Sequence, residues 1–395
     1  MFFEHLQKVP PDPIFGLKDA FKADPCPEKV DLSVGIYKTP DLKTPVLHCV
    51  SQAAKQILTH EKVGNYLPFD GDPQFVEEVK LLIFGESQNL ERVYGAQSLG
   101  GTGGLSILAE FIFREIGKTI YVPDPTWANH APVFQKAGLE VQAYPYYSSE
   151  KMGTHFEKTY DFISKLPEKS IILLHACCHN PTGSDLTQDE WKALLQLFKK
   201  KNLLPLFDLA YLGLGFGLEE DAYSIRLFSS VLPEVLIVTT FSKNFSLYRE
   251  RIGAVFALTK GKKERDLVGG KIKRLMRTTY SNPPSYGAEI VKEILRDEVL
   301  KKQWIEELKA IRIRLTNLRN QFVDRLAGES GLNSYQFLKG HKGMFSFCNL
   351  QKDQVRMLIE RFSIYMPGNG RINISGLNDQ NIDYVINAIL HVSKL

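Results

Sequence analysis

Between residues 119 and 259 the chain alternates short, almost continuously apolar segments with stretches of helical periodicity, and this alternation strongly constrains the fold. The apolar segments are 119–125, 139–147, 170–181, 202–211, 234–244 and 251–259. Strands that are apolar on both faces are typical of a mostly parallel sheet covered by helices on both sides. The sequence therefore predicts an α/β fold with a large domain built around such a sheet.

The segments outside this region predict further helices and a second, smaller domain. Apolar residues recur at helical spacing in 46–60 and 72–84, and residues 285–328 read as one long charged helix or two. In 187–201, Thr187 and Glu190 form a capping box at a helix start. The final stretch alternates short strands with helices, which predicts a smaller α/β domain.

Composition and charge exclude several classes of protein. The chain has 395 residues, 44% of them hydrophobic, and its net charge of +4 is too small to indicate a nucleic-acid partner. No apolar run approaches the roughly 20 residues that span a bilayer, and Glu4 interrupts the start where a secretory signal would lie. The five cysteines are odd in number, and Cys177 and Cys178 are adjacent. We therefore expect a reduced, cytoplasmic protein with no membrane partner.

Polar residues gather where the predicted parallel strands end. The ends fall at 124–127, 179–180, 208–211 and 242–243. Ligands of open α/β sheets bind beyond the carboxyl ends of the strands. The sequence thus predicts a ligand site built from these four segments.

Three features near these ends suggest a chemistry, and each also has an ordinary structural explanation. The glycine-rich run 100–104 precedes an apolar helical segment, so it either binds an anion such as phosphate or forms a tight turn. Lys243 follows an apolar strand and is either a desolvated, Schiff-base-forming amine or a surface charge. Asp208, with Tyr211 close by, is a buried partner for a protonated ring nitrogen, a helix cap or an ion pair with Arg251.

Other charged or metal-binding patterns are weaker. His175, Cys177, Cys178 and His179 resemble metal ligands, but in a strand Cys178 would point away from the other three, so no metal is expected. The lysine-rich stretches read as solvated helix faces. Arg371 opens a strand after two glycines, a position suited to carboxylate recognition.

Taken together, the motifs resemble one family over essentially the whole chain. LSVGIYK, NYLPFDG, GGTGG, DPTWANH, HACCHNPTG, PLFDLAY, SKNFSLYRERIG, YSNPP and GMFSF occur in the order and spacing of the class I, fold-type I pyridoxal-phosphate enzymes. The chain resembles their aspartate or aromatic amino-acid aminotransferases. With this resemblance the expected division is an arm (1–12), a small domain (13–45 and 309–395) and a large cofactor domain (46–308).

The resemblance implies a role for each motif residue. Lys243 would hold pyridoxal 5'-phosphate as a Schiff base and carry the proton, and Asp208 would keep the pyridine nitrogen protonated, backed by His130. Tyr211 and Asn180 would bind the phenolic oxygen, and Trp127 would stack on the ring. The phosphate would be held by Gly101, Thr102, Thr240, Ser242 and Arg251, joined by Tyr66 of the neighbouring subunit. Arg371 would bind the α-carboxylate of the substrate, and Arg277 of the neighbouring subunit would bind its distal carboxylate. The substrate would also contact Gly35, Asn180 and Trp127.

The resemblance thus implies a cytoplasmic homodimer with shared active sites. It would move an amino group between aspartate, glutamate or an aromatic amino acid and 2-oxo acids such as 2-oxoglutarate and oxaloacetate. One alternative is another pyridoxal-phosphate reaction, a lyase or decarboxylase, but paired Arg371 and Arg277 favour transamination. A catalytically silent, cofactor-binding regulator is a further alternative, against which the retained Lys243 argues.

Overall fold

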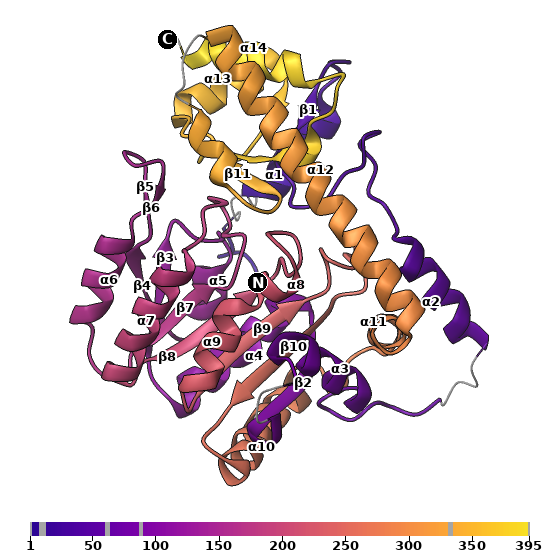
Figure 1. The fold of residues 1–395 in the computed structure, drawn as a ribbon, viewed down its shortest axis with the longest axis vertical. Coiled ribbons are helices and arrows are strands. Elements are labelled where there is room, and N and C mark those ends of the chain that lie inside the picture. Colours follow the sequence, from indigo (N-terminus) through magenta and orange to yellow (C-terminus); the bar gives the residue numbers. More distant parts are fainter. Residues whose placement is uncertain (1, 8–12, 60–63, 87–89, 331–334, 394–395) are drawn as a thin grey trace.

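The structure is a computed structural model, and it describes residues 2–7, 13–59, 64–86, 90–330 and 335–393. Its centre is a seven-stranded sheet in the order β2-β10-β9-β8-β7-β3-β4 (Figure 1). The strands are β2 (Val93–Leu99), β3 (Thr119–Asp124), β4 (Glu140–Pro145), β7 (Ile171–His175), β8 (Leu204–Leu209), β9 (Val235–Thr240) and β10 (Ile252–Leu258). β10 runs opposite to the other six strands, and the pairs that do not involve β10 are parallel. The predicted mostly parallel sheet is confirmed.

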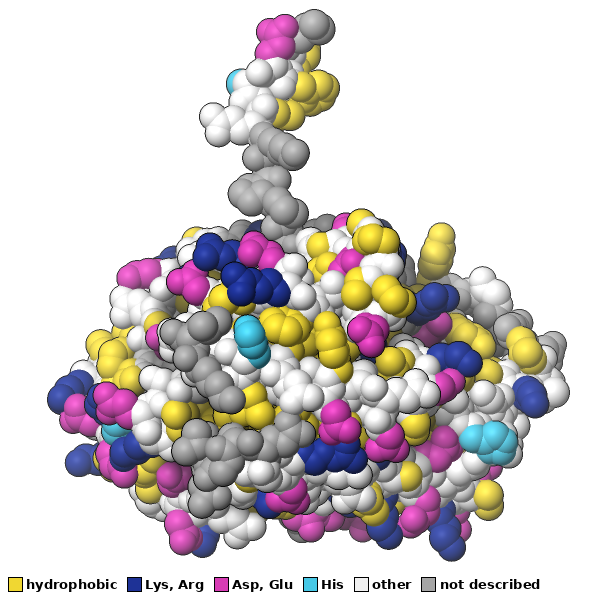
Figure 2. All heavy atoms as spheres, turned by 90° about the horizontal axis from the view of Figure 1, so that it is seen from above, with side chains coloured by type: hydrophobic (Ala, Val, Ile, Leu, Met, Phe, Trp, Pro, Cys, Tyr) yellow, Lys and Arg dark blue, Asp and Glu magenta, His cyan; other side chains and the backbone are white. Residues whose placement is uncertain are grey.

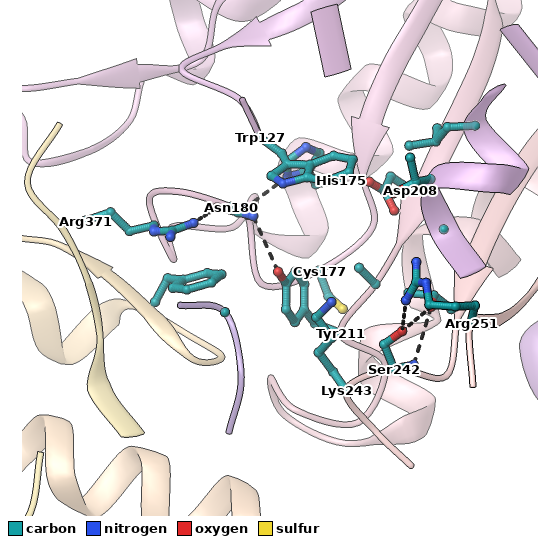
Figure 3. Close-up of a pocket in the computed structure, with 17 residues that line it drawn as sticks. Trp127, His175, Cys177, Asn180, Asp208, Tyr211, Ser242, Lys243, Arg251 and Arg371 are labelled. Atoms are coloured by element: carbon teal, nitrogen blue, oxygen red, sulfur yellow. Dashed lines mark hydrogen bonds between the residues drawn. The ribbon is translucent and has the colours of Figure 1, made fainter. Parts of the chain in front are cut away.

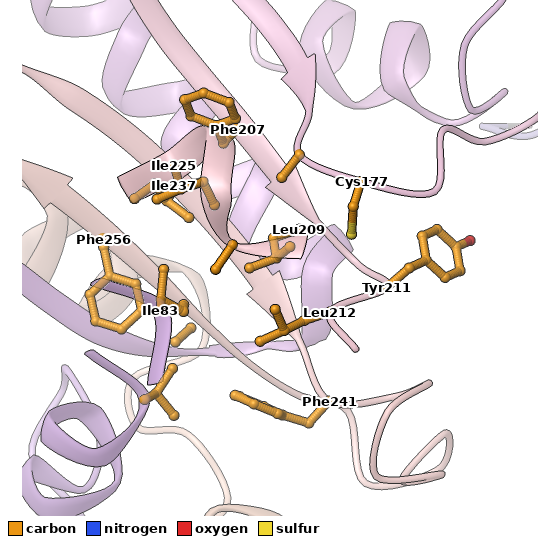
Figure 4. Close-up of a cluster of buried hydrophobic side chains, with 14 of the residues drawn as sticks. Ile83, Cys177, Phe207, Leu209, Tyr211, Leu212, Ile225, Ile237, Phe241 and Phe256 are labelled. Carbon is orange, nitrogen blue, oxygen red and sulfur yellow. The ribbon is translucent and has the colours of Figure 1, made fainter. Parts of the chain in front are cut away.

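Helices cover both faces of this sheet because its strands are apolar on both sides. Leu173, Leu206 and Val238 pack on one face with α4 (Gly100–Glu115), α5 (His130–Lys136) and α10 (Lys262–Thr279). Phe207 and Ile237 belong to the cluster on the other face. That face is covered by α3 (Pro73–Phe84), α6 (Phe156–Lys165), α7 (Gln188–Lys201) and α9 (Tyr223–Val231). The same cluster extends to α2 (His48–Thr59) and α11 (Tyr286–Arg296), which pack on each other beside the sheet (Figure 1). Figure 4 shows this second cluster extending from Ile83 and Phe256 to Cys177 and Tyr211.

A smaller body forms around its own apolar cluster. It contains β1 (Val30–Asp31), β11 (Phe345–Phe347), α13 (Lys352–Phe362), β12 (Ile364–Tyr365), β13 (Arg371–Asn373) and α14 (Ile382–Ser393). The helix α12 (Glu298–Ser330) joins both bodies, since Leu315 packs in the large cluster and Leu318 in the small one. β1 pairs with β12, which places residues 30–31 beside residues 364–365. The exact domain boundaries stay a prediction.

The remaining elements are short, apart from the helix α1 (Pro13–Ala23) near the start. They are η1 (Leu90–Arg92), β5 (Tyr147–Ser148), β6 (Gly153–Thr154), α8 (Leu218–Asp221), η2 (Gln336–Gly340) and η3 (Ile374–Gly376). No helix in the described ranges is both long and apolar enough to cross a membrane. On the face shown in Figure 2, acidic and basic side chains are interspersed.

Two details of the sequence interpretation need correction. The strand expected over 170–181 ends at His175, so the alternation of faces assumed for the following residues does not apply. Cys178 adopts a left-handed conformation (φ 50°), and its thiol lies beside that of Cys177 rather than on the opposite side. The strand β2 (Val93–Leu99) was not expected at all, because it carries the polar residues Gln97 and Ser98.

Candidate active site

A cavity opens at the edge of the sheet where the parallel strands end (Figure 3). β10 runs the other way, so its first residues reach the same edge. The structure brings twelve of the predicted site residues to the cavity wall: Gly35, Gly101, Thr102, Trp127, Asn180, Asp208, Tyr211, Thr240, Ser242, Lys243, Arg251 and Arg371. The strand ends therefore meet at one cavity, and the binding roles of these residues stay predictions.

Lys243 follows β9 and lines the cavity with its amine. Its Nζ lies 6.0 Å from the centre of the Tyr211 ring and 5.9 Å from that of Tyr248. Burial and the nearby charge of Arg251 lower the pKa of Lys243 to about 8, although Asp208 opposes the shift. At pH 7 roughly a tenth of this amine is thus uncharged and able to attack a carbonyl carbon, far more than for an ordinary lysine.

Asp208 sits in β8 with its carboxylate reaching the cavity wall, and His130 lies behind it. His130 Nε2 and Asp208 Oδ2 are 3.0 Å apart. Burial would raise the pKa of Asp208, but the hydrogen bond from His130 and the positive charges of His130 and Lys243 outweigh burial and hold this pKa below the ordinary value. The ion pair with Arg251 considered from the sequence is not formed. The carboxylate remains charged and available to a cationic group in the cavity.

A chain of hydrogen bonds links Asp208 to the main chain of Asn180. The Asn180 N–H donates to His175 Nδ1 at 3.2 Å, so the proton of neutral His175 lies on Nε2. That nitrogen faces Thr126 Oγ1 at 3.3 Å, and the same hydroxyl is 2.8 Å from His130 Nδ1. Burial lowers the pKa of His175 to about 3, which keeps its ring neutral. These hydrogen bonds therefore fix the orientation of the His130 ring, which supports Asp208.

A group of hydrogen-bond donors lies elsewhere along the cavity wall, where α4 begins. The helix α4 begins at Gly100 without any side-chain cap, so main-chain N–H groups of its first turn remain available. Ser242 Oγ lies 3.1 Å from Thr240 Oγ1 and accepts from Arg251 at 3.2 Å. Gly100 has φ 66°, and a Cβ there would lie 2.6 Å from the Arg251 guanidinium, so only glycine allows this close approach. Hydroxyls, N–H groups and a guanidinium together suit a phosphate.

Arg371 lines the cavity from the small body and is only 4% exposed. It donates to Asn180 Oδ1 at 3.2 Å and to the Ser33 carbonyl oxygen, and both acceptors are neutral. Its Nε has no partner among the described residues. Burial lowers the pKa of Arg371 to about 10, which leaves it charged at neutral pH. A buried guanidinium with neutral acceptors and a free N–H is arranged to receive a carboxylate.

Phe345 is a site residue that sequence reasoning missed. Its ring covers the Arg371 guanidinium, with 4.2 Å between the guanidinium carbon and the ring centre. Phe345 and Arg371 lie on the neighbouring strands β11 and β13, whose pairing is not visible in the sequence. A Cβ on Gly35 would be 3.0 Å from this ring, which explains the glycine there. A carboxylate must therefore approach Arg371 along its edge.

Tyr66 and Arg277 lie apart from this cavity. They line a separate hollow together with Phe69 and residues 280–284. Tyr66 is 91% exposed, and the Arg277 guanidinium lies 4.8 Å from the centre of the Phe69 ring and donates to the Ser281 hydroxyl. Neither residue completes the active site of its own chain, and their assignment to a neighbouring subunit stays a prediction.

The fold and cavity fit a class of enzyme that holds a phosphorylated compound beside a nucleophilic lysine and a carboxylate substrate beside a buried arginine. Comparison with known proteins agrees. The sequence profile of the family "Aminotransferase class I and II" matches residues 27–389. The aspartate aminotransferase of Haemophilus influenzae is 39% identical over 394 residues, covering 99% of this chain and 100% of the relative. The aromatic-amino-acid aminotransferase of Paracoccus denitrificans is 40% identical, covering 98% and 99%.

Solved structures give the same result. The crystal structure of an aromatic-amino-acid aminotransferase from Burkholderia pseudomallei, covalently bound to pyridoxal phosphate, superposes with a TM-score of 0.96 at 40% identity and covers 99% of each chain. The cytoplasmic aspartate aminotransferase of Saccharomyces cerevisiae reaches 0.95 at 35% identity, covering 99% and 98%. The chain belongs to the class I and II aminotransferases. The family and fold expected from the motifs are confirmed.

Proposed function

We propose that this protein is a pyridoxal-phosphate-dependent transaminase that moves an amino group between aspartate, glutamate or an aromatic amino acid and a 2-oxo acid. The observation that carries the proposal is one cavity holding Lys243 and the uncompensated Arg371 guanidinium. Lys243 binds the carbonyl group of the cofactor, and Arg371 binds the α-carboxylate that every amino-acid substrate bears. Relatives named as aspartate and aromatic-amino-acid aminotransferases support both substrate classes.

The residues present fit the cofactor. The uncapped start of α4 and the Arg251 guanidinium suit its phosphate, and Asp208 can pair with a protonated ring nitrogen. Asn180 Nδ2 lies 3.4 Å from the Tyr211 hydroxyl, so both side chains can reach one phenolic oxygen. Trp127 lines the same cavity, with its ring perpendicular to that of His130. When bound, the cofactor supplies a carbonyl carbon for the amino group and a ring that withdraws electrons from the substrate Cα.

Three side chains of this protein then have separate roles in the reaction. Arg371, held by Asn180 and covered by Phe345, fixes the α-carboxylate. Lys243 takes the proton from Cα and returns it to the carbon that receives the amino group. Asp208 holds the proton on the ring nitrogen, which a neutral partner could not do.

We propose further that two chains assemble with shared sites, since Tyr66 and Arg277 lie outside their own cavity and face solvent in the single chain. Arg277 would then read the distal carboxylate of aspartate or glutamate. The five free cysteines fit a reducing, cytoplasmic setting.

Half-reactions test the proposed function. Aspartate, glutamate, tyrosine and phenylalanine are each mixed with the holoenzyme, and the absorbance of the bound cofactor is followed. Each should convert the cofactor to its amine form in one turnover, and 2-oxoglutarate should reverse the change. Release of ammonia or carbon dioxide instead would support the lyase or decarboxylase alternative.

Asp208→Asn should slow catalysis much more than it weakens cofactor retention. The residues proposed to hold the phosphate are unchanged, but an amide cannot stabilise a protonated ring nitrogen. We expect a rate loss on the order of 10²-fold or more. The measurement compares the rate of deuterium exchange at the substrate Cα with cofactor loss on dialysis. Unchanged exchange in the variant would contradict the role of the carboxylate.

Phe345→Leu should raise KM more than it lowers kcat. A cation–π contact in a desolvated site contributes about 1–2 kcal/mol, so KM should rise roughly 5- to 30-fold. The rise should be similar for aspartate and phenylalanine, because both use Arg371. Phe345→Tyr keeps a ring over the guanidinium and is the matched control. An unaltered KM in the leucine variant would show that the ring does not position Arg371.

The lowered pKa of Lys243 predicts how cofactor loading depends on pH. The pKa of about 8 means that the neutral amine forms as pH rises through 8 rather than through the ordinary lysine range. The rate at which cofactor-free protein takes up pyridoxal phosphate should rise up to about pH 8 and then level off. A rate still rising tenfold per unit at pH 9 would indicate an ordinary amine.

A further inference from the structure

A second cavity lies behind the active site, on the other side of loop 176–180. It has a volume of about 520 Å³, and Cys177, Asp185, Asp221 and Lys342 contribute to its wall. Cys177 also lines the active-site cavity (Figure 3). Cys177 in this loop thus lines both cavities.

The two adjacent thiols of this loop are held side by side. The N–H groups of Cys178 and His179 donate to the two carboxylate oxygens of Asp185 at 2.7 and 2.8 Å. On the other side Gly343 packs so closely that a Cβ there would lie 2.7 Å from the Cys178 Cβ. The left-handed backbone at Cys178 turns its side chain towards Cys177, and the two sulfur atoms lie within 4.8 Å of each other.

The carboxylate of Asp221 lies beside the two thiols. The donor atoms of Cys177, Cys178 and Asp221 all lie within 4.8 Å of one another, and all three residues are buried. Main-chain N–H groups hold both Asp221 oxygens: those of Gly213 and Gly215 at 2.8 and 2.9 Å, and that of Phe216 at 2.9 Å. Such outer contacts keep a carboxylate in position for a metal ion.

We infer that Cys177, Cys178 and Asp221 form a binding site for a thiophilic divalent cation such as Zn²⁺ or Cd²⁺, and that its occupation inhibits the enzyme. Both thiols lose their protons to solvent, and the cation binds two sulfur atoms and one carboxylate oxygen. Tetrahedral ligands of Zn²⁺ are about 3.5–4 Å apart, so the group needs only a small contraction. Water from the second cavity takes the fourth position, and Lys342 offsets part of the remaining negative charge.

Inhibition follows from the position of the loop. Two residues beyond Cys178, Asn180 accepts from Arg371 through its amide oxygen and donates its main-chain N–H to His175. Contraction of the thiol pair would displace this asparagine and with it the carboxylate site. This part of the inference rests on the proposed function, whereas the binding of the cation does not.

Metal binding is measured first. Holoenzyme cleared of metals by a chelator is titrated with Cd²⁺, followed by equilibrium dialysis and by the ultraviolet absorption of cadmium–thiolate bonds. We expect one Cd²⁺ per chain with thiolate absorption, and tighter binding at higher pH because protons are released. Cys177→Ser and Cys178→Ser should each weaken binding at least about 100-fold, whereas Cys49→Ser, which alters a buried thiol in α2, should bind normally. Binding that persists in both loop variants, or no thiolate absorption in the wild type, would overturn the site.

Inhibition is measured second, with each variant compared with its own activity without metal. Zn²⁺ should inhibit wild type and Cys49→Ser, a chelator should restore activity, and Cys178→Ser should resist at the same concentration. Stoichiometric binding without inhibition would overturn the coupling to Asn180. If the enzyme shows no transamination at all, the proposed function fails, while the Cd²⁺ titration still decides the metal site.

Discussion

Lys243→Ala is expected to abolish amino-group transfer while the protein stays folded. The amine is both the group that binds the cofactor carbonyl and the group that moves the substrate proton. Among the described residues, no other lysine lines the cavity, so none can replace Lys243. The loss in kcat should exceed about 10⁴-fold, the range contributed by a positioned general base. Single-turnover rates with aspartate and phenylalanine provide the measurement.

The control for this variant is Lys199→Ala, which removes an exposed lysine from α7. It should keep wild-type rates. Thermal unfolding of both variants shows whether the fold persists. A Lys243→Ala enzyme with near wild-type turnover would remove the basis of the proposed mechanism.

Arg277→Ala should lower kcat/KM for aspartate by roughly 10²–10³-fold or more. The proposed role of Arg277 is to pair with the distal carboxylate in a closed, water-poor site. Leaving a charge unpaired there costs about 3–5 kcal/mol. Phenylalanine has no distal charge, so its reaction should fall far less. Equal losses for both substrates would refute a role in selectivity.

The matched comparison is Arg371→Ala, which removes the other proposed carboxylate partner. All amino-acid substrates carry the α-carboxylate, so this variant should be impaired with aspartate and phenylalanine alike. A pattern in which Arg371→Ala spares phenylalanine would mean that the two arginines have been assigned in the wrong order.

Mixed dimers test whether Arg277 acts across subunits. In a hybrid of Arg277→Ala with Lys243→Ala, one site receives an intact lysine and an intact arginine from different chains. Aspartate activity should therefore rise on mixing above that of either variant alone. No recovery after subunit exchange has been verified would contradict the shared-site assembly.

The sequence predicted which strand ends line the cavity because the positions of the polar residues agree with the topology. Asp208, Lys243 and Asn180 each follow or end an apolar segment, and parallel strands bring their carboxyl ends to one edge. Arg251 joins them because β10 is antiparallel. The two-helix reading of 285–328 also holds, since α11 ends at Arg296 and α12 begins at Glu298.

What the sequence could not supply depends on contacts between distant segments. Phe345 and Arg371 meet through a strand pair, and no local pattern marks the phenylalanine as a site residue. The edge strand β2 was not predicted because the polar Gln97 interrupts its apolar pattern. Gln97 is nevertheless buried, since its amide accepts from the Asp72 N–H and donates to the Pro284 carbonyl. The turn of Cys178 depends on Asp185, seven residues away, which a strand periodicity does not include.

The role of His130 came from the resemblance rather than from its own pattern. A histidine six residues after a strand end has no distinctive signal. The structure gives the physical reason for its place: α5 begins at His130 and directs the ring towards Asp208 in β8.

The central claim is that this cavity transfers an amino group from one carbon skeleton to another. The most direct test incubates the holoenzyme with 2-oxoglutarate and with aspartate that carries a heavy nitrogen isotope, and analyses the products by mass spectrometry. The account predicts labelled glutamate and unlabelled oxaloacetate in equal amounts, with no labelled ammonia. Labelled ammonia, or loss of carbon dioxide from aspartate without labelled glutamate, would contradict it.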